Sequence, residues 1–183
     1  MQRLVVVGPP GSGKTTIARA VSRKLGLPHV ELDSLWWKPD WKQAGAESFS
    51  ERASAVAAGD RWVVDGNYFT VGARETVWPR ADAIVWLDHS RWVTIPRVVW
   101  RTLLRGIRRE ELWSGNRESL RLALRPDSIV LFAWRAHPKY NRRYEGLDRD
   151  PALAHLRWFR LRTPREVRRF LRTLGAPGRG ERG

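Results

Sequence analysis

The sequence predicts an α/β fold in which helices flank a parallel sheet. Short β-branched runs alternate with helical patterns, and the first run leads directly into a glycine-rich loop and a helix. The length of 183 residues, with 42% hydrophobic residues, suits one domain with one core. We therefore expect five parallel strands in a single domain over residues 1–175, followed by a flexible Gly- and Arg-rich tail over residues 176–183.

The first strand and its loop carry the most specific pattern. Arg3–Val7 has the composition of a buried strand, and residues 8–16 read GPPGSGKTT, which matches G-x-x-x-x-G-K-[ST] between a strand and a helix. In such a loop, backbone N–H groups surround phosphate oxygens, the lysine reaches the β- and γ-phosphates, and the hydroxyl after it binds Mg²⁺. The sequence thus predicts ATP and Mg²⁺ as cofactors. The expected nucleotide-binding residues are Gly8, Gly11, Ser12, Gly13, Lys14, Thr15 and Thr16, with Thr15 also on the metal.

Apolar runs and capping signals predict the later elements. The further strands are expected over residues 29–32, 61–65, 83–87 and 155–161. Ser48 with Glu51 predicts a capping box at the start of one helix, and Thr163 with Glu166 predicts another, with proline at its first position. The order of strands and helices favours a parallel sheet with helices on both faces.

Two carboxylates follow predicted strands, at the sheet edge where ligands of such folds bind. Asp65 is expected to reach the metal through water, across from Thr15. Asp33 ends the second predicted strand and is expected to accept a proton from an attacking hydroxyl. For each carboxylate, a role as a helix cap or turn residue is the alternative.

Several segments together resemble the adenylate-kinase-like small P-loop kinases, in particular the bacterial branch labelled topology modulation proteins. They are the first strand with its loop, LDSLWW (32–37), VVDGNY (63–68), the Arg-rich helix and ELWSGNRES (111–119). The resemblance spans nearly the whole chain. It implies a five-stranded parallel core, a lid that closes over ATP, and phosphoryl transfer to a small molecule. It also implies that the loop containing Arg162 lies near the adenine.

The departures from adenylate kinases bear on the phosphate acceptor. Those enzymes carry Asp-Gly-Phe-Pro-Arg after the third strand, whereas this chain has DGNYF over 65–69 and no arginine until Arg74. AMP is therefore disfavoured, although a nucleoside monophosphate kinase stays an alternative. An acid followed by aromatics resembles sugar-acid and shikimate-type kinases, in which an Asp orients a hydroxyl nucleophile. The expected acceptor-binding residues are Asp33, Trp36, Trp37, Asn67 and Tyr68.

The chain has 11 tryptophans, so a single one does not indicate a site. Trp62, Trp86 and Trp100 lie in strand or amphipathic patterns and are expected in the core. Trp36 and Trp37 lie in an aperiodic segment, where substrate stacking and a local hydrophobic cluster are both open.

An Arg-rich helix is predicted from Ser90 to Arg109, with a lid over about 105–117. At 100° per residue its arginines share one face, and Ile95, Val99, Leu103 and Ile107 are expected to be buried on the opposite face. Arg101, Arg105 and Arg109 are the expected stabilisers of the transferred phosphoryl group. An ordinary solvated helix face is the alternative.

The charge is unevenly distributed. The chain has 34 basic and 19 acidic residues, a net charge of +15, and residues 91–183 carry +14 of it, 23 basic minus 9 acidic. This excess motivates a rival hypothesis, an ATP-dependent nucleic-acid-associated protein. A general bias of the composition towards arginine would also produce this excess of basic residues. The absence of cysteine excludes disulfides and thiolate metal sites.

The N-terminal apolar run is too short for a signal peptide, and no run reaches 18 apolar residues, so we expect a cytoplasmic protein without a membrane partner. The oligomeric state is left open.

Overall fold

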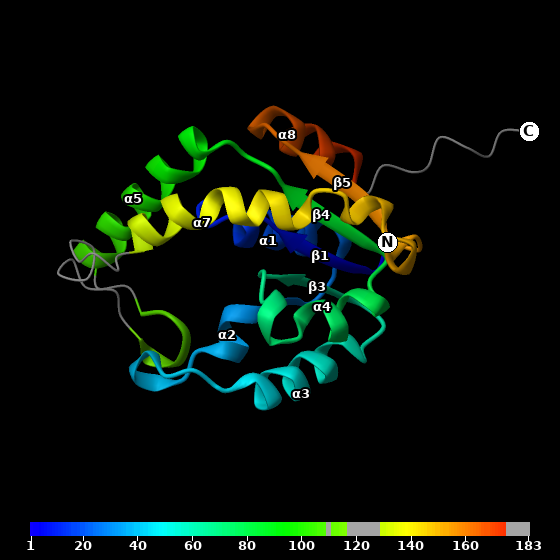
Figure 1. The fold of residues 1–183 in the computed structure, drawn as a ribbon, viewed down its shortest axis with the longest axis horizontal. Helices are drawn as coiled ribbons and strands as arrows, with labels where there is room; N and C mark the ends of the chain where they lie inside the picture. The colour runs from blue at the N-terminus through cyan, green and yellow to red at the C-terminus, as the bar shows by residue number, and fades with distance from the viewer. Residues whose placement is uncertain (109–110, 117–128, 175–183) are drawn as a thin grey trace, which may run out of the picture.

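Five parallel strands form the centre of the molecule, in the order β2-β3-β1-β4-β5 (Figure 1). The strands are β1 (Arg3–Val7), β2 (His29–Glu31), β3 (Trp62–Asp65), β4 (Ala83–Leu87) and β5 (Arg157–Leu161). The structure is a computed structural model, which describes residues 1–108, 111–116 and 129–174. The predicted five-stranded parallel sheet is confirmed, and β1, which leads into the glycine loop, is its middle strand.

Helices cover both faces of this sheet. In the described part of the chain they are α1 (Lys14–Leu25), α2 (Leu32–Trp36), α3 (Ala46–Ala57), α4 (Ala73–Thr76), α5 (Arg91–Arg108), α7 (Ile129–Tyr144) and α8 (Pro164–Thr173). Single 3-10 turns at Pro39–Trp41, Phe69–Val71, Trp78–Arg80, Trp113–Gly115, Leu147–Arg149 and Pro151–Leu153 connect them. None of the helices described is both long and apolar enough to cross a bilayer.

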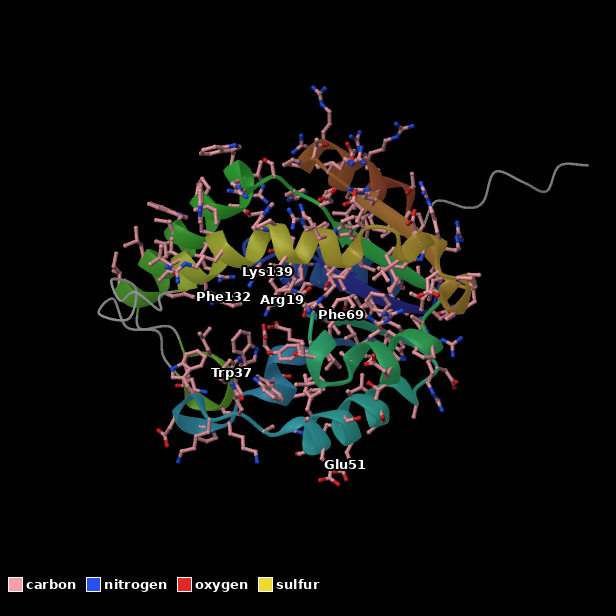
Figure 2. The ribbon with its side chains drawn as sticks, in the orientation of Figure 1. Arg19, Trp37, Glu51, Phe69, Phe132 and Lys139 are labelled. Carbon is pink, nitrogen blue, oxygen red and sulfur yellow. The ribbon has the colours of Figure 1, made fainter. Side chains whose placement is uncertain are left out.

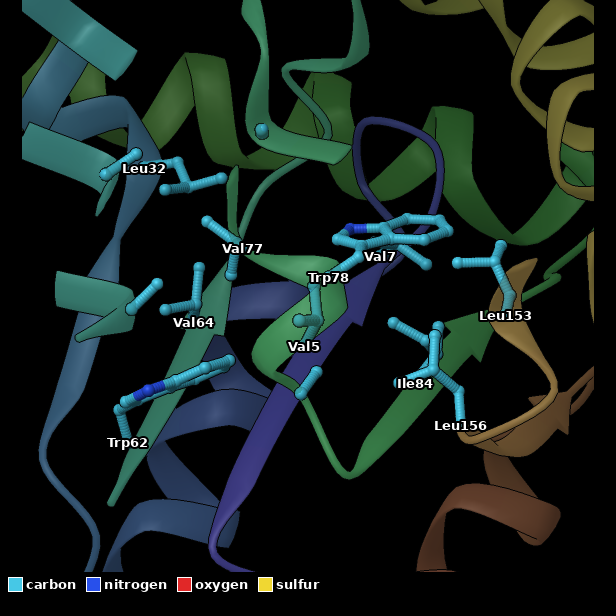
Figure 3. Close-up of a cluster of buried hydrophobic side chains, with 14 of the residues drawn as sticks. Val5, Val7, Leu32, Trp62, Val64, Val77, Trp78, Ile84, Leu153 and Leu156 are labelled. Carbon is cyan, nitrogen blue, oxygen red and sulfur yellow. The ribbon is translucent and has the colours of Figure 1, made fainter. Parts of the chain in front are cut away.

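The core forms two layers because successive strand residues point to opposite faces. On one face, Val5 and Val7 pack with residues of α3, α4 and the 3-10 turns, including the fully buried Trp78 (Figure 3). On the other face, Leu4 and Val6 pack with α1 and α8. Trp62 and Trp86 are buried, as predicted.

Two local predictions change in the structure. The second strand ends at Glu31 and α2 begins at Leu32, so Asp33 lies in the first turn of a helix and not at a strand end. The helix α3 begins at Ala46, because Gly45, with φ of 83°, turns the chain just before it. Ser48 is therefore inside α3, and the Ser48 capping box is wrong.

The capping box at α8 is confirmed. The hydroxyl oxygen of Thr163 accepts a hydrogen bond from the backbone N–H of Glu166 at 3.2 Å. The Glu166 carboxylate in turn accepts from the backbone N–H of Arg162 at 2.7 Å, and this hydrogen bond is the main cause of the lowered pKa of Glu166.

The predicted orientation of α5 is wrong. Its buried residues are Thr94, Val98 and Thr102, whereas the expected core side, represented by Leu103 and Ile107, is exposed. Small side chains allow α5 to lie close to α7 and to the glycine loop, and this packing decides which face turns inward. Trp100, predicted in the core, is 65% exposed on the same outer face. Pro96 lies inside α5 without ending it.

Candidate active site

A cavity of about 1170 Å³ lies beyond the carboxyl ends of the strands. Its walls come from the glycine loop and α1, from the β2–α2 junction, and from α5, α8 and the turn at Trp113. This is the position at which open parallel sheets bind their ligands. Several residues that the sequence predicted for the site line this cavity. Among the described residues they are Gly11, Ser12, Gly13, Lys14, Thr15, Thr16, Asp33, Arg101 and Arg105.

The glycine loop is shaped by glycines with positive φ. Gly8, Gly11 and Gly13 have φ of 148°, 77° and 92°. Residues with side chains rarely adopt these values, and they turn the loop so that it can follow a phosphate group. Lys14 begins α1, and its Nζ donates to the carbonyl oxygens of Gly8 at 3.0 Å and Pro9 at 3.3 Å.

A second reason for glycine at position 11 is the close approach of α5, which the loop motif does not indicate. A Cβ there would lie 2.4 Å from the carbonyl oxygen of Thr94 and 2.6 Å from Cγ2 of Val98. Both atoms belong to α5, so the glycine loop and α5 touch at this point. A side chain at Gly11 would push the Arg-bearing helix away from the loop.

We predict that Gly11→Ala lowers the free energy of unfolding by roughly 2–3 kcal/mol, because overpacking adds to backbone strain. Gly13→Ala is the matched control: its φ is also positive, but a Cβ there would meet nothing within 4 Å. We expect Gly13→Ala to cost only about 1–2 kcal/mol. Urea denaturation without nucleotide measures both, and equal losses would mean that the contact with α5 is unimportant.

Lys14, Asp33 and Asp65 converge beside the loop. Burial lowers the pKa of Lys14, and the nearby Asp33 and Asp65 oppose that shift. Burial likewise raises the pKa of Asp33, against the hydrogen bond from Tyr68 and the charge of Lys14. The site therefore holds two carboxylates and one ammonium group within mutual electrostatic range.

Asp65 ends β3, the strand next to β1, and is 3% exposed. One carboxylate oxygen lies 3.5 Å from Nε2 of His29, and the other, Oδ2, is buried without a hydrogen-bond partner in the structure. An unsatisfied buried carboxylate oxygen requires an explanation. A hydrated cation between Asp65 and Thr15 would supply one, and oxygen donors are those that Mg²⁺ prefers.

Asn67 binds the glycine loop. Its Nδ2 donates to the carbonyl of Gly8 at 2.9 Å, and its Oδ1 accepts from the N–H of Gly8 at 3.2 Å. The hydroxyl of Tyr144 also donates to this Oδ1, at 2.6 Å. Asn67, predicted to contact the acceptor, is not among the described residues that line the cavity.

Tyr68 binds Asp33. Its hydroxyl donates a hydrogen bond to the Asp33 carboxylate, and burial raises the pKa of Tyr68, so the phenol keeps its proton. The Tyr68 ring lies 5.0 Å from Phe49 and 5.8 Å from Trp36 between centroids. The Asn67–Tyr68 pair thus connects the glycine loop to the acceptor-side carboxylate. As with Asn67, Tyr68 is outside the described cavity lining.

The tryptophan segment forms a local cluster. Trp36 packs on Phe49 at 5.7 Å, and Trp37 packs edge-on against Trp41 at 5.5 Å. Neither Trp36 nor Trp37 is among the described lining residues, so substrate stacking by them stays a prediction. Trp113 is the tryptophan that lines the cavity, and only the resemblance, through ELWSGNRES, pointed to its segment.

Residues 111–116, which belong to the predicted lid, are bound to this segment. Asn116 is buried; its Oδ1 accepts from the N–H of Trp41 at 2.9 Å, and its Nδ2 donates to the carbonyl of Lys38 at 2.8 Å. The Ser114 hydroxyl donates to the carbonyl of Trp37 at 2.8 Å. Hydrogen bonds therefore join residues 111–116 to the segment from Trp37 to Trp41.

Glu31 joins three elements at the cavity wall. It accepts from Nη2 of Arg19 at 2.6 Å and from Nε1 of Trp113 at 3.1 Å. In Figure 2 the exposed Arg19 side chain is seen between α7 and the segment that carries Trp37. The Arg19–Glu31–Trp113 contact links α1, β2 and the lid, and sequence reasoning missed it because the three residues share no local pattern.

Arg101 and Arg105 line the cavity from α5, together with Arg97. Arg109 lies outside the described residues, as does the lid beyond residue 116. Arg162 is not among the described lining residues; it lies 3.7 Å from the carboxylate of Asp88. The α8 side of the cavity comes from Pro164, which the resemblance implied with Arg162 in the adenine loop, and from Val167, Arg168 and Leu171, which the sequence did not single out.

Known proteins share this fold and sequence pattern. Residues 4–64 match the family model "ATPase family associated with various cellular activities (AAA)". A shikimate kinase from Symbiobacterium thermophilum is 31% identical over 127 residues, covering 61% of this chain and 70% of that protein. The chain belongs to the family of small P-loop kinases that includes shikimate kinase. A probable gluconokinase from Schizosaccharomyces pombe is 47% identical over 58 residues, covering 32% of this P-loop kinase and only 27% of the relative.

Solved structures agree with this P-loop kinase fold. A shikimate kinase from Bacteroides thetaiotaomicron has a TM-score of 0.53 at 18% identity, covering 94% of this chain and 96% of that one. A gluconokinase from Sinorhizobium meliloti has a TM-score of 0.50 at 18% identity, covering 95% and 93%. At these identities the likeness shows the fold alone.

Proposed function

We propose that this chain transfers the γ-phosphoryl group of ATP to a hydroxyl group of a small molecule. One observation carries the proposal: Asp33, an acceptor-side carboxylate, lies in the same cavity and within electrostatic range of Lys14 of the phosphate-binding loop. A nucleotide-hydrolysing domain without an acceptor does not require a second carboxylate at that place.

The reaction assigns a role to each group. Asp33 takes the proton of the acceptor hydroxyl as its oxygen bonds to the γ-phosphorus, while the bond from that phosphorus to the β–γ bridging oxygen breaks and ADP leaves. Lys14 and the arginines of α5 balance charge on the transferred group. Thr15 and Asp65 would hold Mg²⁺, which neutralises phosphate charge when bound; the buried, unpartnered Oδ2 of Asp65 supports this assignment.

Nucleoside monophosphates are disfavoured as acceptors. The first arginine after β3 is Arg74, and its Nη2 is paired with the carboxylate of Asp150 at 2.7 Å. It is therefore engaged away from the cavity. The named relatives act on shikimate and gluconate, which are polyhydroxylated acids, so we propose a polyhydroxylated acceptor. The reaction uses the cellular ATP pool, so the proposal includes a cytoplasmic location.

The test is acceptor-dependent ADP release from Mg·ATP. Pools of sugars, sugar acids, cyclic polyols, nucleosides and nucleoside monophosphates are supplied one at a time. We expect one hydroxyl pool to raise the rate well above the ATPase background, and splitting that pool identifies the acceptor. A rate that no pool changes, but that single-stranded DNA or RNA raises, would support the nucleic-acid hypothesis instead.

Tyr68→Phe is expected to shift the pH dependence of turnover. The Tyr68 hydroxyl stabilises the ionised form of Asp33, so its removal raises the pKa of Asp33 further. Turnover requires ionised Asp33, so the acidic limb of the kcat profile should move to higher pH with little change in KM for ATP. Tyr144→Phe is the control, since the Tyr144 hydroxyl donates to Asn67 and not to Asp33. An unmoved acidic limb would exclude this role of Tyr68.

A further inference from the structure

The helix α5 presents an apolar stripe to solvent. Trp92, Val99, Trp100, Leu103 and Ile107 fall within about 100° of arc around the helix axis. Trp92 is 76% exposed, Trp100 65% and Ile107 68%. These are large side chains, and the stripe runs along nearly the whole helix without a charged residue in it. Within a soluble domain such a stripe would ordinarily be buried.

The neighbouring helix α7 extends this surface. The rings of Trp92 and Trp134 are 6.1 Å apart between centroids, and the guanidinium of Arg91 lies 4.8 Å from the Trp134 ring centroid. Leu131, which is 39% exposed near the start of α7, lies within about 60° of Trp134 around that helix. We call seven exposed side chains of both helices the α5–α7 face: Trp92, Val99, Trp100, Leu103, Ile107, Leu131 and Trp134.

The size of this face matches one half of a protein interface. At their observed exposures, the three rings and four aliphatic side chains offer on the order of 800 Å², the share of one partner in a standard interface. The largest apolar patch on a typical monomer is roughly 300–600 Å². The α5–α7 face therefore exceeds what an isolated domain usually leaves in water.

The distribution of charge favours a second copy of the chain as the partner. The chain carries a net charge of +15, so two copies repel one another wherever their charged surfaces meet. The α5 stripe is free of charge, and three arginines of that helix, Arg97, Arg101 and Arg105, line the cavity, whereas Arg91 lies against Trp134 beside the stripe. Arginines directed into the cavity are poorly placed to contact an anionic membrane or nucleic acid spread over the outer face. Because charged surfaces of two copies repel one another, the copies can meet only through an uncharged surface, and the α5 stripe provides one.

We propose that the α5–α7 face binds a second copy of this chain, forming a dimer in which the same face is used by both partners. Such isologous dimers are the commonest oligomers. The dimer would hold α5 from outside, while the inner side of α5 touches Gly11 and presents arginines to the cavity. If the proposed function holds, the partner copy would thereby restrict the movement of the arginines that face the phosphates.

Sedimentation velocity over a wide concentration range, without ATP, tests the proposal independently of any kinase activity. We expect the wild-type chain to be a dimer, and Trp100→Arg and Ile107→Arg each to raise its dissociation constant at least about 30-fold. The matched control is Ala58→Arg, which adds the same charge at an exposed position just after α3, far from α5 in Figure 1. It should leave the dimer intact.

Three results would overturn the proposal. The first is a monomeric wild type whose Trp100→Arg variant melts several degrees lower, because the face is then covered by the same chain. The second is a monomer that binds phosphatidylserine vesicles or a single-stranded oligonucleotide and loses this binding in Trp100→Arg. The third is a dimer that neither substitution weakens while both variants remain folded by circular dichroism.

Discussion

Replacing Lys14 with alanine is expected to reduce ATP-dependent phosphoryl transfer by about 10²–10³-fold, the size of the loss when one group that stabilises transition-state charge is removed. Lys14 is the buried ammonium group between the glycine loop and the two carboxylates. Its loss removes the cation that reaches the phosphates, and it also leaves Asp33 and Asp65 without their positive neighbour. The pKa of Asp33 should rise as a result.

The measurement is the initial rate of ADP formation in the presence of the acceptor, together with ATP binding by calorimetry. Lys24→Ala is the matched control, because Lys24 lies in the last turn of the same helix and is exposed. It should keep the wild-type rate. If Lys14→Ala kept that rate too, the phosphates would have to bind elsewhere, and the proposed function would fail.

Replacing Asp33 with asparagine is expected to lower kcat by about 10²–10⁴-fold, the usual contribution of a general base. Asparagine keeps the shape of the side chain and can still accept the hydrogen bond from the Tyr68 hydroxyl. It cannot take a proton from an acceptor hydroxyl. The KM for ATP should change little, because the phosphates are held by the loop and not by Asp33.

Although Asp33→Asn should lower kcat, it is not expected to lower the free energy of unfolding. Burial raises the pKa of Asp33 in the folded chain, so the folded state binds its proton more tightly than the unfolded state does. The resulting stability is present at low pH and is lost as pH rises through the folded pKa. At neutral pH, Asp33→Asn should therefore be at least as stable as the wild type in urea denaturation.

Asp40→Asn is the control for both measurements. Asp40 is a solvent-exposed carboxylate in the nearby 3-10 turn, 3.8 Å from the ammonium of Lys42. Its substitution should change neither kcat nor the free energy of unfolding by a measurable amount. Full turnover in Asp33→Asn would remove the general base from the proposed mechanism while leaving nucleotide binding by the loop intact.

The sequence by itself determined the features that depend on short stretches of chain. A strand, the loop GPPGSGKTT and a helix follow one another within 25 residues, and their chemistry depends on backbone geometry that glycines set locally. The capping box at Thr163 is likewise a contact over three residues. The alternation of strands and helices was enough to predict the parallel sheet, since parallel strands require crossover helices.

Only the tertiary structure decided which groups meet across the cavity. Asn116 bonds the backbone near Lys38 and Trp41, Tyr68 bonds Asp33, and Gly11 touches α5, each pair separated by at least 35 positions. The orientation of α5 belongs with these contacts. Its periodicity correctly identified an apolar and a basic side. A helix with one apolar and one basic side can pack with either side towards the interior of the domain. Close packing of Thr94 and Val98 against the glycine loop decided that the arginines line the cavity and the tryptophans face solvent.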